Sequence, residues 1–258
     1  MFIACFDAGG KEESTPWITV AGFVAPATAW IEFEQKWKQR LSDDGLTYFH
    51  MVDFAHFSNE FAHGWKDNEP RRRKLLADLM EMIVSNASRK FSVSIESGTL
   101  QKHVEEKLRS HYLLNAFVLG ARACAGKVMA WARRDKIGTP IEFVFEEGDV
   151  GKGKLIERFQ YDGFGTPVFR HKKDTTVKGI CYPAFTPLHA ADFLAYEMFQ
   201  VAKRRSTDRW AWGEFRRVVG EPTYMTENNL DNWNMKLRVT LDHARWWKSV
   251  VKGGVQSR

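Results

Sequence analysis

Phe2-Ile-Ala-Cys-Phe-Asp7-Ala-Gly-Gly10 is the stretch from which the fold can be worked out. Its apolar residues predict a buried strand, with Asp7 at the end of the strand and a glycine turn after it. The run from Trp17 to Val24 is rich in β-branched and aromatic residues, so it predicts a second strand that pairs with the first as a hairpin. Because an unpaired carboxylate is costly to bury, we expect Asp7 either to stay hydrated or to find a cation. The alternative is that Asp7, before Gly9-Gly10, is an ordinary turn residue.

Outward from this hairpin, helical and strand patterns alternate along the chain, which predicts a mixed α/β domain. A helix of about 14 residues from Thr28 carries an apolar stripe at helical spacing, formed by Trp30, Phe33, Trp37 and Leu41. The other predicted elements are, in order, a loop with a short helix at 47–67, a helix at 70–88, a strand at 90–97, one long helix at 110–135, a strand at 141–147, a helix at 154–161, a short strand within 167–173, a helix at 187–202 and a mainly helical region at 207–250.

Length and composition fit one soluble globular domain. A chain of 258 residues, 44% of them hydrophobic, can bury a core without a disulfide or metal staple. We expect residues 1–258 to form a single domain with a mixed central sheet flanked by helices, an inserted helical and loop region at about 28–135, and a helical C-terminal extension at about 207–258.

Cysteine spacing and hydropathy exclude several classes of protein. Cys5, Cys124 and Cys181 lie far apart and form no C-x-x-C pair, which argues against a disulfide framework and a thiolate zinc site. The first residues lack the basic segment of a signal peptide, and no uncharged run reaches the roughly 18 residues of a membrane span. We therefore expect a cytoplasmic protein that does not enter a membrane.

Charge is distributed unevenly along the chain. Residues 1–150 hold 19 basic and 21 acidic side chains, whereas residues 151–258 hold 19 basic and 11 acidic ones. The net charge of +6 therefore comes from the second part of the chain. Because contacts of Lys and Arg with phosphates supply most nonspecific affinity for nucleic acid, this asymmetry predicts a nucleic-acid partner. It leaves the oligomeric state open.

Two further segments place acidic residues where they need a partner. The predicted strand at 141–147 ends in Glu146-Glu147, and Asp192 interrupts an apolar, alanine-rich helix. If the two strands are neighbours, Asp7 and the glutamates emerge at one edge of the sheet, where open α/β sheets bind ligands. Carboxylates from unconnected elements are suitable ligands for Mg2+ or Mn2+, and two such ions can activate water and stabilise a leaving phosphate oxygen.

Which of the two glutamates faces the site stays open at this stage. Adjacent strand residues point to opposite faces, and Glu147 shares a face with Phe143 and Phe145, whereas Glu146 lies on the other face. If the face that carries Phe143 and Phe145 is the one turned toward the site, this alternation favours Glu147 as the site residue. Asp149 is a further candidate.

The order of these motifs resembles the DUF3800 family of bacterial and phage proteins. The matching pieces are the strand followed by Asp7-x-Gly-Gly, then Phe49-His50-Met51-Val52-Asp53 with Phe61 and Gly64-Trp65, then the strand ending in Glu146-Glu147, and then the segment from Pro187 through His189 and Asp192 to Glu197. The resemblance covers residues 3 to about 200, and its last piece is the most specific. It implies an RNase H-like fold and metal-dependent phosphodiester hydrolysis, with Asp7, Glu146 or Glu147, and Asp192 as metal ligands and catalytic carboxylates.

Two positions depart from the pattern of that family. The family usually has Asp-Glu-Ser-Gly where this chain has Asp7-Ala8-Gly9-Gly10, which removes one acid and predicts weaker metal binding. The family usually has Gln where this chain has His189, an imidazole about one helical turn before Asp192. We predict that His189 is a metal ligand or a phosphate contact.

His50 and several basic residues complete the predicted site. Because histidine titrates near neutral pH, His50 is predicted to be a catalytic acid or base with Asp53 beside it. The alternative is that His50 caps a turn and Asp53 begins a helix. Two basic clusters flank the helix of Asp192 and are predicted to contact substrate, and C-terminal tryptophans either stack on bases or fill a helical core. These residues are Arg170, Lys172, Lys173, Lys203, Arg204 and Arg205, and Trp210, Trp212, Trp233, Trp246 and Trp247.

Together these observations predict a Mg2+- or Mn2+-dependent nuclease that cleaves DNA or RNA. One alternative is an RNase H-like nucleic-acid-binding or scaffold protein that has lost catalysis, for which the missing acid after Asp7 argues. Another is a hydrolase of a small phosphorylated molecule. Strand binding with a steep salt dependence separates the first two functions from the third.

Overall fold

The computed structural model describes residues 1–10, 14–111, 115–148, 151–204, 206, 210–232 and 235. A six-stranded sheet crosses the molecule in the order β5-β4-β1-β2-β3-β8. The strands are β1 (Phe2–Gly9), β2 (Trp17–Pro26), β3 (Arg89–Glu96), β4 (Ile141–Glu146), β5 (Val168–Arg170) and β8 (Pro222–Met225). The predicted mixed α/β class is therefore confirmed.

Strand β2 alone runs against the others in this sheet. It pairs antiparallel with β1 and with β3, whereas β1 with β4, β4 with β5 and β3 with β8 are parallel pairs. The predicted hairpin of β1 and β2 is confirmed, with Phe2 opposite Pro26 and Gly9 opposite Thr19. Because β1 and β4 are parallel neighbours, their carboxyl ends lie at the same edge of the sheet.

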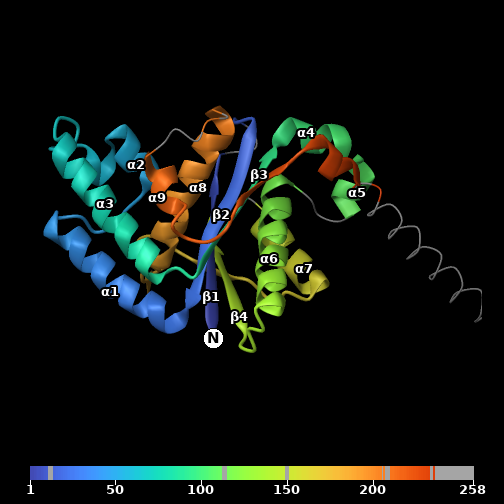
Figure 1. Ribbon diagram of the computed structural model, residues 1–258, viewed down its shortest axis with the longest axis horizontal. Helices are drawn as coiled ribbons and strands as arrows, with labels where there is room; N and C mark the ends of the chain where they lie inside the picture. The colour runs from blue at the N-terminus through green and yellow to red at the C-terminus, as the bar shows by residue number, and fades with distance from the viewer. Residues whose placement is uncertain are drawn as a thin grey trace, which may run out of the picture.

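Helices cover both faces of the sheet, so the molecule has three layers (Figure 1). On one side lie α1 (Ala27–Asp43), α2 (Met51–His56), the 3-10 helix η1 (Asn59–Phe61), α3 (Glu69–Asn86), α8 (Pro187–Arg204) and α9 (Trp210–Phe215). On the other side lie α4 (Ser97–His103), α5 (Glu106–His111), α6 (Ala116–Arg134) and α7 (Lys152–Asp162). A separate two-stranded sheet is formed by β6 (Thr175–Val177) and β7 (Ile180–Tyr182).

The sheet has a hydrophobic core on each face. Along β1, Ile3 and Cys5 join the core beneath α1, α3 and α8, whereas Ala4 and Phe6 join the core beneath α6 and α7. Side chains of either parity are therefore buried in the central strands, as expected for a sheet covered by helices on both faces. This two-sided burial determines which acidic residues reach the functional site.

Helix α1 shows why the apolar stripe forms core. The predicted stripe of Trp30, Phe33, Trp37 and Leu41 is buried, which confirms the prediction. The helix starts at Ala27, earlier than predicted, because Pro26 occupies the cap position, so Thr28 is not the cap. Pro26 is also the last residue of β2, paired with Phe2, so the chain passes from strand to helix at this residue.

The predicted single helix at 110–135 is wrong in its first part. Helix α5 ends at His111 and α6 begins at Ala116, with the Asn115 side chain accepting a hydrogen bond from the Val118 amide at 2.7 Å. Asparagine is among the best residues at a helix start, so it sets this boundary although the apolar pattern runs through it.

The region from residue 207 onward is not simply helical in its described part. Strand β8 follows α9 and pairs with β3 at the edge of the sheet. The segment 28–135, expected as an insertion, contains β3, which belongs to the central sheet. Within the described part of the chain, no helix is both long enough and apolar enough to cross a membrane.

Candidate active site

Asp7, Glu146 and Asp192 converge at the carboxyl edge of β1 and β4. The register pairs Phe6 with Phe145, so Asp7 and Glu146 are the next residues along two adjacent parallel strands. Helix α8 packs across β1 and β2 and brings Asp192 to the same edge. Gly9 permits this approach, because a Cβ atom there would lie 2.7 Å from the Ala195 carbonyl oxygen.

Lys172 lies at the centre of the three carboxylates. Its Nζ atom is 2.9 Å from Asp7 Oδ2, 2.8 Å from Glu146 Oε2 and 3.0 Å from Asp192 Oδ1. The Lys172 side chain is only 11% exposed, so these contacts replace most of its hydration. Lys172 was predicted to contact substrate, and in this structure its ammonium group is held inside the acidic cluster.

Burial and neighbouring negative charge raise the pKa values of two of these acids, Asp7 and Glu146. Burial, together with the neighbouring charge of Asp192, raises the pKa of Asp7, and Lys172 only partly opposes this. Burial and then the charge of Asp7 raise the pKa of Glu146 to about 8. Burial disfavours the charged form of Lys172, but the three carboxylates outweigh it and raise its pKa well above the usual value. A cluster of three acids with one ammonium group is therefore short of positive charge.

Only Glu146 of the two candidate glutamates joins the cluster. Glu147 instead pairs with Lys152, whose Nζ lies 2.7 Å from each of its carboxylate oxygens. The parity argument that favoured Glu147 fails because both faces of β4 are buried: Phe143 and Phe145 pack in the core beneath α6 and α7. Glu146 points to the opposite side, where α8 carries Asp192.

His50 connects the three-carboxylate cluster to a fourth acidic residue, Asp53. It is the residue before α2, in an extended conformation and without a side-chain cap bond. Its Nε2 atom lies 3.4 Å from Asp192 Oδ1, and its Nδ1 atom lies 3.2 Å from Asp53 Oδ2. The other Asp192 oxygen accepts the Met51 amide at 2.7 Å, which anchors the start of α2 to the site. His50 is about a third exposed, so substrate and solvent can reach its ring.

Asp53 is held by several hydrogen bonds. It lies within α2 and accepts from Tyr48 Oη at 2.9 Å, Ser58 Oγ at 3.0 Å and Asn59 Nδ2 at 2.9 Å. Burial alone would raise its pKa, but these bonds and His50 outweigh burial and lower it. Asp53 is therefore an ionised, fixed acceptor that orients the His50 ring.

His189 has both ring nitrogens engaged inside the protein. Trp37 Nε1 donates to His189 Nδ1 at 3.0 Å, so the ring proton is on Nε2, which bonds to the Lys172 carbonyl oxygen. Burial, followed by the positive charges of Lys172, His50 and Lys38, lowers the pKa of His189 to about 4. The structure thus places His189 behind the cluster, where it holds the backbone of Lys172.

We expect His189 to make the protein sensitive to acid. The ring takes up a proton near pH 6.5 in the unfolded chain but only near pH 4 in the folded protein, so acid favours unfolding. The free energy of unfolding is expected to fall by roughly 2 to 3 kcal/mol from this group between about pH 7.5 and about pH 4.5. Urea unfolding of the wild type and of His189→Gln measures it. Glutamine can bond to Trp37 and Lys172 without titrating, so equal acid losses in the two proteins would contradict the assignment.

The remaining predicted residues lie at different distances from the cluster. Arg170 ends β5 beside β4, and Lys173 is exposed with its Nζ 5.7 Å from the Tyr48 ring centroid. Lys203 and Arg204 are exposed at the far end of α8, about 16 Å along the helix from Asp192. The structure therefore brings only some of the predicted substrate contacts near the carboxylates. Outside the described residues lie Asp149, Arg205, Trp233, Trp246 and Trp247.

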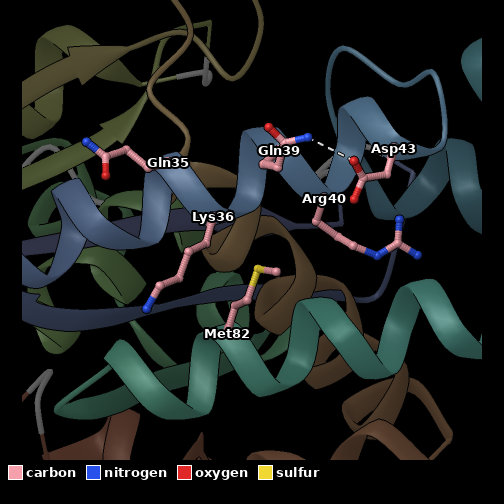
Figure 2. A pocket seen from close by; sticks show the side chains of 6 residues that line it. All are labelled: Gln35, Lys36, Gln39, Arg40, Asp43 and Met82. Carbon is pink, nitrogen blue, oxygen red and sulfur yellow. Dashed lines mark hydrogen bonds between the residues drawn. The ribbon is translucent and has the colours of Figure 1, made fainter.

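A groove between α1 and α3 lies apart from these residues. It has a volume of about 410 Å³, and Figure 2 shows it lined by polar side chains of α1 with one methionine of α3. None of the predicted site residues lines it. The lining residues are Gln35, Lys36, Gln39, Arg40, Asp43 and Met82.

Comparison with protein-family models, curated proteins and solved structures found no match to this chain. Among the described residues, no group of three or more His, Cys, Asp and Glu side chains is arranged at distances suited to holding a metal ion. The carboxylate oxygens are spaced around an ammonium group, 2.8 to 3.0 Å from its nitrogen, whereas Mg2+ needs oxygens at about 2.0 to 2.1 Å.

Proposed function

We propose that this protein is a divalent-metal-dependent nuclease that hydrolyses phosphodiester bonds in DNA or RNA. One observation carries the proposal: carboxylates from β1, β4 and α8 surround a single cation position, now held by the ammonium group of Lys172. Three buried acids with only one positive charge make a strongly cation-seeking site. Carboxylate oxygens are the ligands that Mg2+ and Mn2+ prefer.

The donor set fits a divalent ion if Lys172 leaves the centre. Asp7, Glu146 and Asp192 would then hold the ion, and the oxygens would move inward by less than about 1 Å. Lys172 lies in the connection between β5 and β6, outside any helix or strand, so its departure requires no break in the central sheet. Bound there, such an ion supplies activation of water and stabilisation of the leaving phosphate oxygen.

The other residues of the site have roles in moving a proton and placing the substrate. The His50 side chain is about a third exposed, its Nε2 atom faces Asp192, and Asp53 fixes the ring from Nδ1. A histidine oriented by a carboxylate in this way is suited to general acid or base catalysis. Arg170 and Lys173 are exposed close to the cluster and are suited to binding phosphates.

Strand topology supports the same proposal. The order β3-β2-β1-β4-β5, with β2 alone antiparallel, agrees with the RNase H-like arrangement that the resemblance to the DUF3800 family implies. In that arrangement the acids gather at the carboxyl edge of β1 and β4, where Asp7 and Glu146 lie here.

Calorimetric titration with Mn2+ tests the site, and a matched pair of variants makes the test specific. Wild-type protein is expected to bind Mn2+ and to cleave DNA or RNA oligonucleotides only when the ion is present. Glu146→Gln is expected to weaken Mn2+ binding by roughly 100-fold or more, since it removes a ligand. Glu147→Gln, at the next residue but paired with Lys152, is expected to bind as the wild type does. Equal binding by the two variants would contradict the proposed site.

A second function is favoured by one specific observation. Lys172 already balances part of the acidic charge, and Ala8 follows Asp7 where the DUF3800 family, which this chain resembles, usually has an acid. Both features suit a nucleic-acid-binding protein that has lost catalysis. This alternative predicts strand binding without Mn2+ uptake and without cleavage by the wild type.

A further inference from the structure

The hairpin formed by β6 and β7 carries an apolar face that is exposed to solvent. Val177 is paired with Ile180, and Thr175 with Tyr182, so these four side chains lie on one face of the hairpin. Val177 is 44% exposed, Ile180 58% and Tyr182 40%. Because an isolated two-stranded hairpin is marginally stable in water, such a face indicates a binding surface.

The base of this hairpin is fixed beside the carboxylate cluster. The Phe185 amide donates to the His171 carbonyl oxygen at 2.8 Å, and the Ala184 amide donates to Asp174 Oδ1 at 2.7 Å. Lys172, which lies between His171 and the first strand of the hairpin, contacts all three carboxylates. A molecule bound along the hairpin therefore extends toward the proposed reaction centre.

The charges around the apolar face indicate which class of molecule binds there. Arg170 and Lys173 are exposed at the base, and Lys178 is exposed at the tip in a left-handed turn with φ of 50°. The acidic residue of the hairpin, Asp174, accepts the Ala184 amide and closes the base. The Tyr182 ring lies beside the His171 ring, with centroids 5.7 Å apart. Basic groups spaced along a surface with an exposed aromatic ring suit a phosphate backbone with bases that stack.

We propose that this hairpin, with Arg170 and Lys173, binds a single strand of nucleic acid and leads it to the carboxylate cluster. The second part of this inference, that the strand leads to the carboxylate cluster, rests on the proposed nuclease function. Strand binding itself needs neither the ion nor cleavage. Phosphates lie against Lys173 and Lys178, and a base stacks on Tyr182. A single strand is favoured over a duplex because stacking on Tyr182 requires an unpaired base.

Fluorescence anisotropy with a labelled single-stranded oligonucleotide, measured in EDTA, tests this surface without catalysis. Tyr182→Ala is expected to weaken binding about 5- to 100-fold through loss of one stacked base. Lys178→Gln is expected to reduce the slope of log K against log salt by about 0.7. Lys36→Gln, an exposed lysine of α1, is the matched control and is expected to change neither quantity. Circular dichroism melting checks that each variant is folded.

The outcomes separate this inference from the proposed function. If the wild type fails to bind Mn2+ but strand binding still depends on Tyr182 and Lys178, the hairpin inference stands and the nuclease proposal fails. If both variants bind the strand as the wild type does, the inference is overturned. Analytical ultracentrifugation of Ile180→Thr gives one more test. The inference is also overturned if this substitution turns a dimer into a monomer and leaves strand binding unchanged, because a second copy of the chain then covers the apolar face.

Discussion

Lys172→Met is expected to lower the free energy of unfolding by about 3 to 5 kcal/mol when divalent ions are removed. The ammonium group lies within 3.0 Å of three carboxylates, and its side chain is only 11% exposed. Removing it leaves buried acids without a cation, which costs far more than the loss of a surface ion pair. Urea unfolding in EDTA measures the difference.

A matched lysine nearby provides the control. Lys152 also makes a short ion pair, with its Nζ 2.7 Å from Glu147, but its side chain is 42% exposed. Exposed pairs contribute at most about 1 kcal/mol, so Lys152→Met is expected to cost that or less. A similar loss in the two variants would mean that burial of Lys172 in the cluster does not determine the stability.

The same substitution is expected to tighten Mn2+ binding by roughly tenfold or more. In the wild type an ion must displace the ammonium group, whereas in Lys172→Met the carboxylates are uncompensated before it arrives. Mn2+ should consequently restore much of the lost stability of Lys172→Met. If the variant binds Mn2+ no better than the wild type, Lys172 does not occupy the position of the ion.

Asp7 and Asp192 were predictable because each interrupts an apolar element. A charge near the end of a buried strand, or inside a helix of Ala, Leu and Phe, is costly unless it has a partner, and both residues prove to share the partner Lys172. The hairpin of β1 and β2 was predictable because both strands are strongly apolar and lie close together in the sequence, although β1 continues past Asp7 to Gly9, where a turn was expected.

Lys172 and the choice of Glu146 were not predictable from local patterns. Lys172 stands in a run of basic residues, and nothing in such a run shows which side chain turns inward. The missing signal was the balance of charge, since three converging acids require a cation from somewhere in the fold. Parity could not choose Glu146 over Glu147 because both faces of β4 are covered.

The sequence contains a pattern that is typical of the hairpin of β6 and β7. Thr175 to Val177 and Ile180 to Tyr182 are two short β-branched and aromatic runs separated by Lys178-Gly179, a two-residue turn with positive φ at both residues. Asn115 was likewise readable as a helix start. Strand β8 was harder to predict. It has only four residues, and its partner β3 lies far from it in the sequence.

Asp192→Asn is expected to reduce cleavage by roughly 10²- to 10³-fold or more while strand binding in EDTA stays within about twofold of the wild type. One carboxylate oxygen contacts Lys172 and His50, and the other accepts the Met51 amide. Asparagine keeps the size of the side chain but removes its charge and turns an N–H group toward one of these donors. The variant therefore loses both a ligand and the alignment of His50.

Asp53→Asn is the matched control for this effect. It makes the same chemical change on α2, but Asp53 contacts the His50 Nδ1 atom and lies outside the three carboxylates around Lys172. We expect roughly a tenfold loss of turnover and unchanged Mn2+ affinity, since only the orientation of His50 is weakened. Single-turnover cleavage and Mn2+ calorimetry on both variants distinguish the two roles. Unchanged cleavage by Asp192→Asn would exclude the carboxylate cluster as the reaction centre, whereas a wild type that binds strands without cleaving them would establish the binding protein instead.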